Sequence, residues 1–199
     1  MAFIVVATNN AHKVDEYRRL MAGEDVELQS LLDYPGCPAI EENGTTFAEN
    51  AGIKAMEASR YCQMPAFADD SGLEVEALDG APGIYSSRYA PTDPERIAKL
   101  LKELEGKENR RARFVCAIAI AWNGEVIETF EGEVRGVIAA APSGSNGFGY
   151  DPVFIPDGYE QSFAELPPEV KNRISHRANA FAKAQAFVEE QLSLLGDLL

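Results

Sequence analysis

The chain has 199 residues, of which 46% are hydrophobic and 25% charged, as in an ordinary globular protein with a sizeable core. Its net charge of −14, from 32 acidic and 18 basic residues, repels nucleic acid polymers and excludes them as bulk partners. A small polyphosphate is compatible with this charge if a local positive pocket and a divalent ion receive it.

The sequence predicts a cytoplasmic protein with no membrane partner. No apolar run approaches the roughly 20 residues that a membrane helix requires. The first residues, Met1 to Ala7, lack the basic leader of a secretion signal. The three cysteines, Cys37, Cys62 and Cys116, are widely spaced and odd in number, which fits neither a disulfide framework nor a zinc knuckle. We interpret them as buried or half-buried thiols.

The first half of the chain alternates predicted strands and helices. Residues 3–8 are apolar and rich in β-branched side chains, which indicates a buried strand. A polar turn from Thr8 to Lys13 leads into a helix with an apolar face made by Val14, Tyr17, Leu20 and Met21. Because free backbone N–H groups point outward at a helix start, this turn predicts an anion site.

A second helix is predicted to begin at Thr46, since Thr46 and Glu49 have the spacing of a capping box. A polar loop with Glu41 and Glu42 precedes it. Residues 65–69 then indicate a short strand that ends in a turn over residues 69–72.

The second half begins with a helix near Thr92 or Asp93, with Pro94 in its first turn. The 3.6-residue spacing of its apolar side chains supports this helix; they are Ile97, Leu100, Leu101 and Leu104. Residues 113–122 and 126–130 flank Asn123-Gly124 and predict a hairpin, and 133–139 and 153–155 predict two further strands. A last helix is expected from Ser175, with an apolar stripe of Phe181, Ala184, Val188, Leu192 and Leu195. The whole predicts a mixed α/β sheet with two lobes about a cleft.

Two adjacent carboxylates, Asp69 and Asp70, are the first candidates for chemistry. Carboxylates at the end of an apolar strand are costly unless they bind a cation or a proton in transit. Successive strand side chains point to opposite sides, so we expect one to face the cleft and the other to cap a turn or helix. The alternative is an Asx turn with Ser71 and Gly72. Glu41 and Glu42 are a second source of carboxylates for magnesium, or else solvated surface.

The loop from Ser143 to Asp151 is the second candidate. Its glycines let the backbone approach a ligand closely, and Phe148 and Tyr150 offer aromatic faces for a flat ring. The alternative is a hairpin bend with core aromatics.

The third candidate is Ser175-His176-Arg177 at a helix start, where the helix dipole disfavours cations and ligand contact would justify them. Its alternative is a surface salt bridge for Arg177 and a packed edge position for His176. Lys171 could join this group, and the remaining phosphate candidates are Lys13, Lys54 and Arg88. Acidic metal ligands, a glycine-rich loop and a polar pair able to read a base together predict nucleotide phosphate chemistry.

With these motifs in this order, the chain resembles the non-canonical purine nucleoside-triphosphate pyrophosphatases, also called the Ham1-like family. The matching segments cover almost the whole chain. They are Thr8, Asn10 and Lys13; Glu41 to Ala51; Ala68 to Leu73; Gly80 to Ser86; Gly147 to Pro152; and Ile174 to Arg177. Glycines frequent in the family are replaced by Asn9, His12 and Asn146.

The resemblance implies a curved mixed β-sheet flanked by helices, with two lobes around a central substrate cleft, in one domain over residues 1–199 and as a homodimer. It implies hydrolysis of ITP, XTP and their deoxy forms to the monophosphate and pyrophosphate, with Mg2+. Asp70 would be the proton acceptor and a metal ligand, with Glu41 as the second ligand. The implied phosphate contacts are Thr8, Asn9, Asn10, Ala11, His12 and Lys13, and Ser71 also contacts substrate. The implied nucleoside site is Phe148, Gly149, Tyr150, Asp151, Lys171, His176 and Arg177.

Base selection follows from donor chemistry. Arg177 can only donate hydrogen bonds, so it favours a 6-oxo purine over the 6-amino group of adenine.

Two other functions compete with this reading: a Maf-type pyrophosphatase acting on modified pyrimidine or other nucleotides, and a nucleotide-binding module without catalysis. The presence of Glu41, Asp70 and Lys13 argues against the binding module, and the lack of repeats or heptads argues against a structural protein.

Overall fold

A computed structural model describes residues 2–23 and 26–196 of the chain, with side chains as far as residue 188. Its strands and helices, in chain order, are β1 Ala2–Val6, α1 Ala11–Leu20, β2 Val26–Ser30, α2 Phe47–Cys62, β3 Ala66–Val75, α3 Asp93–Glu103, β4 Arg111–Trp122, β5 Glu125–Ile138, β6 Phe154–Pro156, α4 Pro168–Ile174 and α5 His176–Gly196. The strands form one sheet in the order β2-β1-β3-β4-β5-β6. Because β1 is parallel to β2 and β3 while β5 is antiparallel to β6, the predicted mixed sheet with flanking helices is confirmed.

The chain divides into two compact units. Unit 1 consists of residues 1–70, 117–132 and 177–199, and unit 2 consists of residues 71–116 and 133–176. Strands β3, β4 and β5 each contribute a segment to both units. The candidate catalytic and binding residues therefore belong partly to unit 1 and partly to unit 2.

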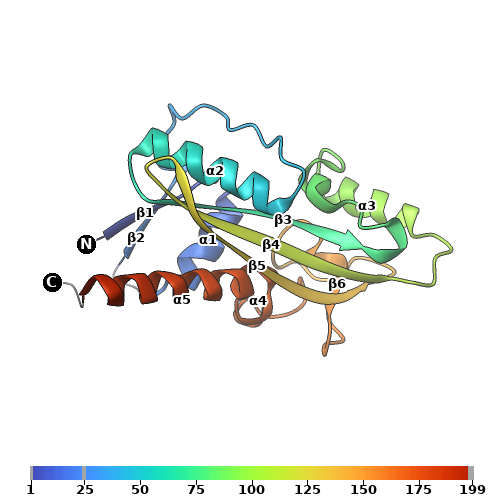
Figure 1. Cartoon of the computed structure of the whole chain (residues 1–199). Helices are drawn as coiled ribbons and strands as arrows, with labels where there is room; N and C mark the ends of the chain where they lie inside the picture. The colour runs from blue at the N-terminus through green and yellow to red at the C-terminus, as the bar shows by residue number, and fades with distance from the viewer. Residues whose placement is uncertain (1, 24–25, 197–199) are drawn as a thin grey trace. The chain divides into compact units, whose positions relative to one another are not determined.

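In unit 1, helix α2 lies on one face of the strands and helices α1 and α5 lie on the other (Figure 1). Aromatic contacts join the second face, because the ring of Tyr17 on α1 lies 4.8 Å from that of Phe67 on β3 and 5.9 Å from that of Phe181 on α5. These three rings fix α1 and α5 against the strand that carries Asp69 and Asp70.

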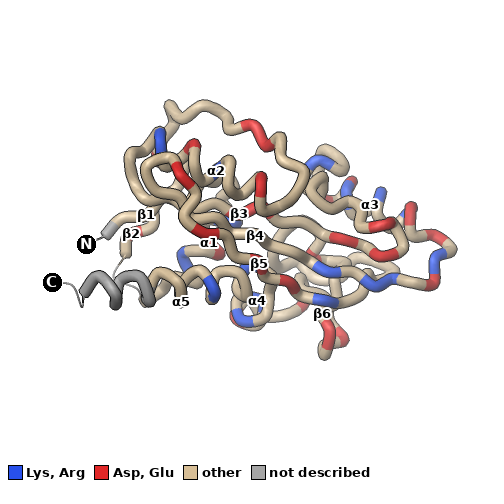
Figure 2. The backbone as a smooth tube through the Cα atoms, in the orientation of Figure 1, with Lys and Arg blue, Asp and Glu red and all other residues tan. Residues whose placement is uncertain are grey.

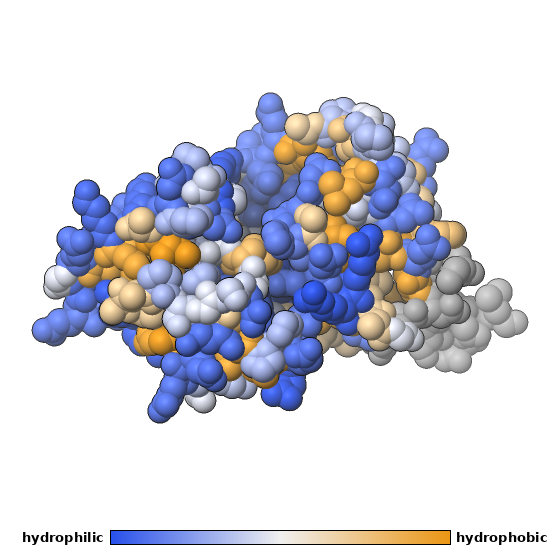
Figure 3. Space-filling view, turned by 180° about the vertical axis from the view of Figure 1, so that it is seen from behind, coloured by the Kyte–Doolittle hydropathy of each residue, from blue (hydrophilic) through white to orange (hydrophobic). Residues whose placement is uncertain are grey.

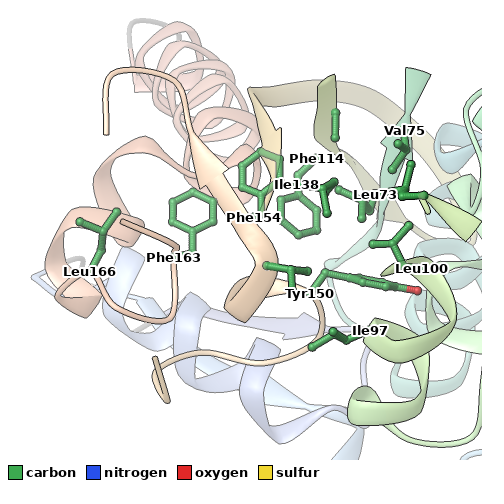
Figure 4. Packing of buried hydrophobic residues seen from close by; sticks show 13 residues of the cluster. Leu73, Val75, Ile97, Leu100, Phe114, Ile138, Tyr150, Phe154, Phe163 and Leu166 are labelled. Atoms are coloured by element: carbon green, nitrogen blue, oxygen red, sulfur yellow. The ribbon is translucent and has the colours of Figure 1, made fainter. Parts of the chain in front are cut away.

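In unit 2, α3 and the ends of four strands enclose an aromatic core (Figure 4). The ring of Phe154 lies 4.6 Å from that of Phe114 and 5.5 Å from that of Phe163. The expected apolar side of α3 is confirmed, since Leu100 and Leu104 are buried there. This core supports the loop that carries Phe148 to Asp151.

The surface agrees with the composition. The face shown in Figure 3 is mainly hydrophilic, with scattered hydrophobic residues, as expected for a strongly charged chain. Across residues 2–23 and 26–196, every helix is too short or too polar to cross a membrane. The three cysteines, all within the described residues, form no disulfide; Cys37 and Cys62 are half-buried and Cys116 is buried, as predicted.

Local sequence signals fixed several element ends correctly. Thr46 caps α2 and Thr92 caps α3, each by accepting a hydrogen bond from the backbone N–H three residues later. In α2 the Glu49 carboxylate accepts from Thr45 rather than from the capping residue. Asn123 and Gly124 both have positive φ, as the predicted two-residue hairpin requires.

Two predictions of secondary structure were wrong. No turn interrupts residues 69–72, because β3 runs on through them to Val75 with both carboxylates paired to basic or amide side chains. The two strands expected over 126–130 and 133–139 are one strand, β5. The last helix, α5, begins at His176, directly after Ser175, as expected. Ser175 also ends α4, and neither α4 nor β2 was predicted from the sequence. The expected stripe residues Leu192 and Leu195 lie beyond the described side chains.

Candidate functional site

Asp69 and Asp70 project from opposite faces of β3. Asp69 faces Lys13 on α1 and Arg177 on α5, whereas Asp70 accepts a hydrogen bond from Asn50 on α2. Their exposed fractions are only 2% and 8%. The expectation that the two side chains diverge is confirmed, but Asp69 pairs with cations instead of capping a turn. Each carboxylate is therefore the centre of a separate cluster.

The Asp69 cluster consists of Lys13, Glu16, Asp69 and Arg177. Asp69 Oδ2 lies 2.9 Å from Lys13 Nζ and 3.0 Å from Arg177 Nη2, and Arg177 Nη1 donates to Glu16. Burial alone would raise the pKa of Asp69, but Lys13 and Arg177 hold it well below its usual range. Two positive and two negative charges balance here, so the cluster is a buried, neutral ion network. The alternative reading of Arg177 as a surface salt bridge is wrong, because Arg177 is buried.

The Asp70 cluster consists of Glu42, Asn50, Lys54 and Asp70. Lys54 Nζ lies 3.1 Å from Glu42 Oε2 and 3.6 Å from Asp70 Oδ1. Burial raises the pKa of Asp70; Lys54 opposes this change and Glu42 adds to it. Burial would lower the pKa of Lys54, yet Asp70, Asp69 and Glu42 hold it above its usual value. Two acids face one base, so this cluster carries excess negative charge.

That excess charge suits a magnesium ion. Within the described part of the chain, no three His, Cys, Asp or Glu side chains gather to hold a metal. Mg2+ needs no such cage, because it commonly takes one or two carboxylates and fills its other positions with water and substrate phosphates. Glu42 and Asp70 provide two carboxylates of the right kind. Glu41, the predicted ligand, is exposed in the same acidic loop, which is marked by the red segment before α2 in Figure 2.

The predicted phosphate turn lies between β1 and α1. Thr8 is half-buried, and Asn9, Asn10, Ala11 and His12 are exposed. Thr8 Oγ1 accepts from the N–H of Asn10, and Asn10 Oδ1 accepts from the N–H of His12 and caps the helix. The turn is thus an ordered helix start that is open to solvent, while Lys13 reaches inward to Asp69.

The three positions at which this chain replaces a glycine frequent in the family do not require glycine's conformational freedom. Among the described residues, the non-glycine positions with positive φ are Gln63, Asp79 and Asn123. Asn9, His12 and Asn146 are therefore outside the left-handed region. Asn146 also donates its side-chain amide to the carbonyl of Leu166, which is a use that glycine lacks.

The Asp151 group, made of Phe148, Asp151 and Lys171, is the main polar feature of unit 2. Lys171 Nζ lies 2.6 Å from Asp151 Oδ2 and 4.8 Å from the centre of the Phe148 ring. The same Asp151 oxygen accepts from the Phe148 N–H at 2.9 Å. Asp151 and Lys171 are buried whereas Phe148 is half-buried. This arrangement presents one aromatic ring beside a buried ion pair.

The other predicted residues of unit 2 have varied surroundings. Tyr150 is a core residue whose hydroxyl donates to the carbonyl of Ser86. Gly149 donates its N–H to Asp93 at the start of α3. The buried His176 stacks on Phe114, with 4.8 Å between the rings. Ser71 is half-buried on β3, and Arg88 is exposed, with its guanidinium 5.7 Å from the ring of Tyr85.

Replacing Gly147 by Ala should destabilise the fold by about 1–3 kcal/mol, the usual cost of local backbone strain. Gly147 has a φ of +73°, and a Cβ there would collide with the carboxylate of Asp151. Gly149→Ala is the matched control, because its φ of +63° is similar but nothing lies within 4 Å of the added Cβ. Thermal unfolding of both variants separates the two effects. Equal losses of stability would show that the collision with Asp151 is unimportant.

Sequence reasoning did not select Glu16 or Asn50, and it did not identify Glu42 as the partner of Lys54. Glu16 and Asn50 each lie about one helical turn from a predicted lysine, and Glu42 directly follows Glu41. Only the direction in which each side chain points could have selected these residues, and the sequence does not give that direction. Asn50 lies three residues after Phe47 and directly before Ala51, so a polar residue at the spacing of an apolar helix face was the available signal.

Comparison with known proteins agrees with these features. A model of the Ham1 family matches residues 4–187. A dITP/XTP pyrophosphatase of Geobacillus kaustophilus is 51% identical over 195 residues, covering 96% of each chain, and one of Deinococcus deserti is 50% identical over 187 residues, covering 92% of this chain and 88% of that protein. The solved Ham1 protein of Coxiella burnetii superposes with a TM-score of 0.87 at 41% identity, over 96% of this chain and all of that one. The chain therefore belongs to the Ham1 family.

Proposed function

We propose that this protein hydrolyses non-canonical purine nucleoside triphosphates, ITP, XTP and their deoxy forms, to the monophosphate and pyrophosphate. The observation that carries the proposal is the Asp70 cluster, a buried carboxylate beside a lysine and a second acid, in a chain half identical to curated dITP/XTP pyrophosphatases. We place this activity in the cytoplasm, where it would remove such nucleotides from the pool.

Asp70 is proposed as the proton acceptor. A water molecule attacks the α-phosphorus in line, a new O–P bond forms, and the bond to the bridging oxygen of the leaving pyrophosphate breaks. The proton of the water passes to Asp70. Burial supports this role because it raises the pKa of Asp70 and so makes its carboxylate a stronger base. Lys54, the cation beside Asp70, is proposed to bind phosphate oxygens, together with Lys13 and the turn from Thr8 to His12.

Glu42 and Asp70 are proposed to hold Mg2+, with Glu41 as a further candidate in the same loop. When bound, Mg2+ supplies positive charge that offsets the phosphate oxygens. The residues of the chain orient the substrate around it: Lys54 already spans the two carboxylates, which keeps them close enough to share one cation.

The nucleoside is proposed to contact Phe148, whose half-buried ring is available for stacking, and the neighbouring Gly149. Asp151 and Lys171 hold the Phe148 loop in place. Further proposed contacts are Ser71, Arg88, Tyr150, His176 and Arg177.

We also propose that the protein acts as a homodimer. Light scattering of the purified protein would contradict this if it gave the 21.7 kDa mass of one chain.

A panel of nucleoside triphosphates tests the function. We expect dITP, ITP and XTP to release pyrophosphate with kcat/KM at least about 100-fold above ATP, since a site built to pair with a 6-oxo group rejects a 6-amino group strongly. Chelation of Mg2+ should abolish the release. Preference for a pyrimidine triphosphate would favour the Maf-type alternative. Tight binding of ITP without pyrophosphate release would favour a binding module.

A further inference from the structure

Asn50 is a buried polar residue for which the proposed reaction has given no role. Its exposed fraction is 0% although it lies in the first turns of α2. Both ends of its carboxamide are used: Nδ2 donates to Asp70 Oδ2 at 3.0 Å, and Oδ1 accepts from the N–H of Gly44 at 2.8 Å. A buried amide that satisfies both ends in this way has a fixed orientation.

The contact with Gly44 is close enough to exclude a side chain there. A Cβ on Gly44 would lie 2.8 Å from Asn50 Oδ1 and 2.7 Å from the Cβ of Glu49. The backbone two residues after Glu42 therefore rests directly on Asn50. The same carboxamide thus holds the acidic loop on one side and Asp70 on the other.

The two oxygens of Asp70 consequently have different partners. Oδ2 accepts from Asn50, while Oδ1 faces Lys54 Nζ at 3.6 Å. A carboxylate held by a hydrogen bond at one oxygen cannot rotate freely, so the other oxygen keeps a defined direction.

We propose that Asn50 is a positioning residue for the hydrolysis proposed above, which fixes the rotation of the Asp70 carboxylate and ties the Glu42 loop to it. The inference rests on the proposed function, because it needs Asp70 as the proton acceptor. Asn50 touches neither substrate nor the reacting water in this role; it acts through Asp70.

The primary variant is Asn50→Asp, which keeps an acceptor for the Gly44 N–H but loses the donor to Asp70. We expect kcat for dITP to fall about 10- to 100-fold while KM changes less than about threefold, because a misplaced base slows the chemical step without weakening binding. Asn50→Ala, which adds no charge, is the second variant and is expected to show the same division between kcat and KM. Ser59→Ala, a buried polar position farther along α2 that contacts Gly124 instead, is the control and should keep the wild-type kcat.

A stability measurement separates positioning from a merely structural role. The exchanged pair Asn50→Asp with Asp70→Asn restores a donor and an acceptor at the same place, so it should recover the melting temperature lost in Asn50→Asp but none of the activity. If the wild type releases pyrophosphate and the folded Asn50 variants keep kcat within twofold, the positioning role is overturned and the proposed function stands. If the wild type releases none from any substrate, the proposed function itself is overturned, and the positioning role with it.

Discussion

Asp70→Asn is expected to lower the kcat for dITP by about 1,000-fold or more while the protein stays folded. Proton transfer by a positioned side chain contributes about 10²- to 10⁴-fold, and an amide cannot accept the proton. The substitution is nearly isosteric, so Asn50 and Lys54 keep a neighbour of the same shape. Pyrophosphate release at saturating dITP and Mg2+ measures the effect. Asp157→Asn is the control, because the Asp157 carboxylate forms an exposed pair with Arg111.

The stability of Asp70→Asn should equal or exceed that of the wild type in buffer without Mg2+. Because the folded-state pKa of Asp70 is raised, the folded protein holds that proton more tightly than the unfolded chain. Wild-type stability therefore falls as the pH rises from the ordinary carboxyl pKa of about 4 through the folded-state value. The variant lacks this loss.

For activity, an Asp70→Asn variant that retained more than a tenth of the wild-type kcat would contradict the role of Asp70 as the base.

The elements that could be predicted from sequence are those fixed by neighbours in the chain. The caps of α2 and α3 and the Asn123-Gly124 turn are local arrangements, and each was found where expected. The course of β3 was missed because Asp69, Asp70, Ser71 and Gly72 have the composition of a turn. Pairing of the two carboxylates with distant residues overrides that local preference.

In the candidate site, too, the sequence predicts what neighbouring residues determine and misses what distant contacts determine. Asp70 and the motifs around it could be selected from their order in the chain. Their partners could not, because Asn50 is 20 residues from Asp70 and Glu16 is 161 residues from Arg177. Lys54, which the sequence offered only as one of several phosphate candidates, is largely buried between two acids. Contacts made only in the folded chain, such as these, select one lysine or one acid among several equivalent candidates.

Asp69→Asn should have the opposite effect to Asp70→Asn, destabilising the fold by about 3–5 kcal/mol, as expected when one partner of a buried ion pair is removed. Lys13 and Arg177 would lose their shared carboxylate, and Arg177 would keep only Glu16 as an anionic partner within the Asp69 cluster. For a chain of this size the melting temperature should fall by about 6–20 °C. Thermal unfolding beside Asp70→Asn makes the comparison, since the two substitutions are chemically identical and adjacent on β3.

The pH dependence of the Asp69 effect has a defined sign. The folded-state pKa of Asp69 is depressed, so its contribution is fully present above the ordinary carboxyl pKa of about 4 and is lost only as the pH falls toward the folded-state value. The stability difference between wild type and Asp69→Asn should therefore be flat from about pH 5 to 8 and shrink in stronger acid. A difference of less than about 1 kcal/mol at pH 7 would show that Asp69 is not the charge that holds Lys13 and Arg177 inside unit 1.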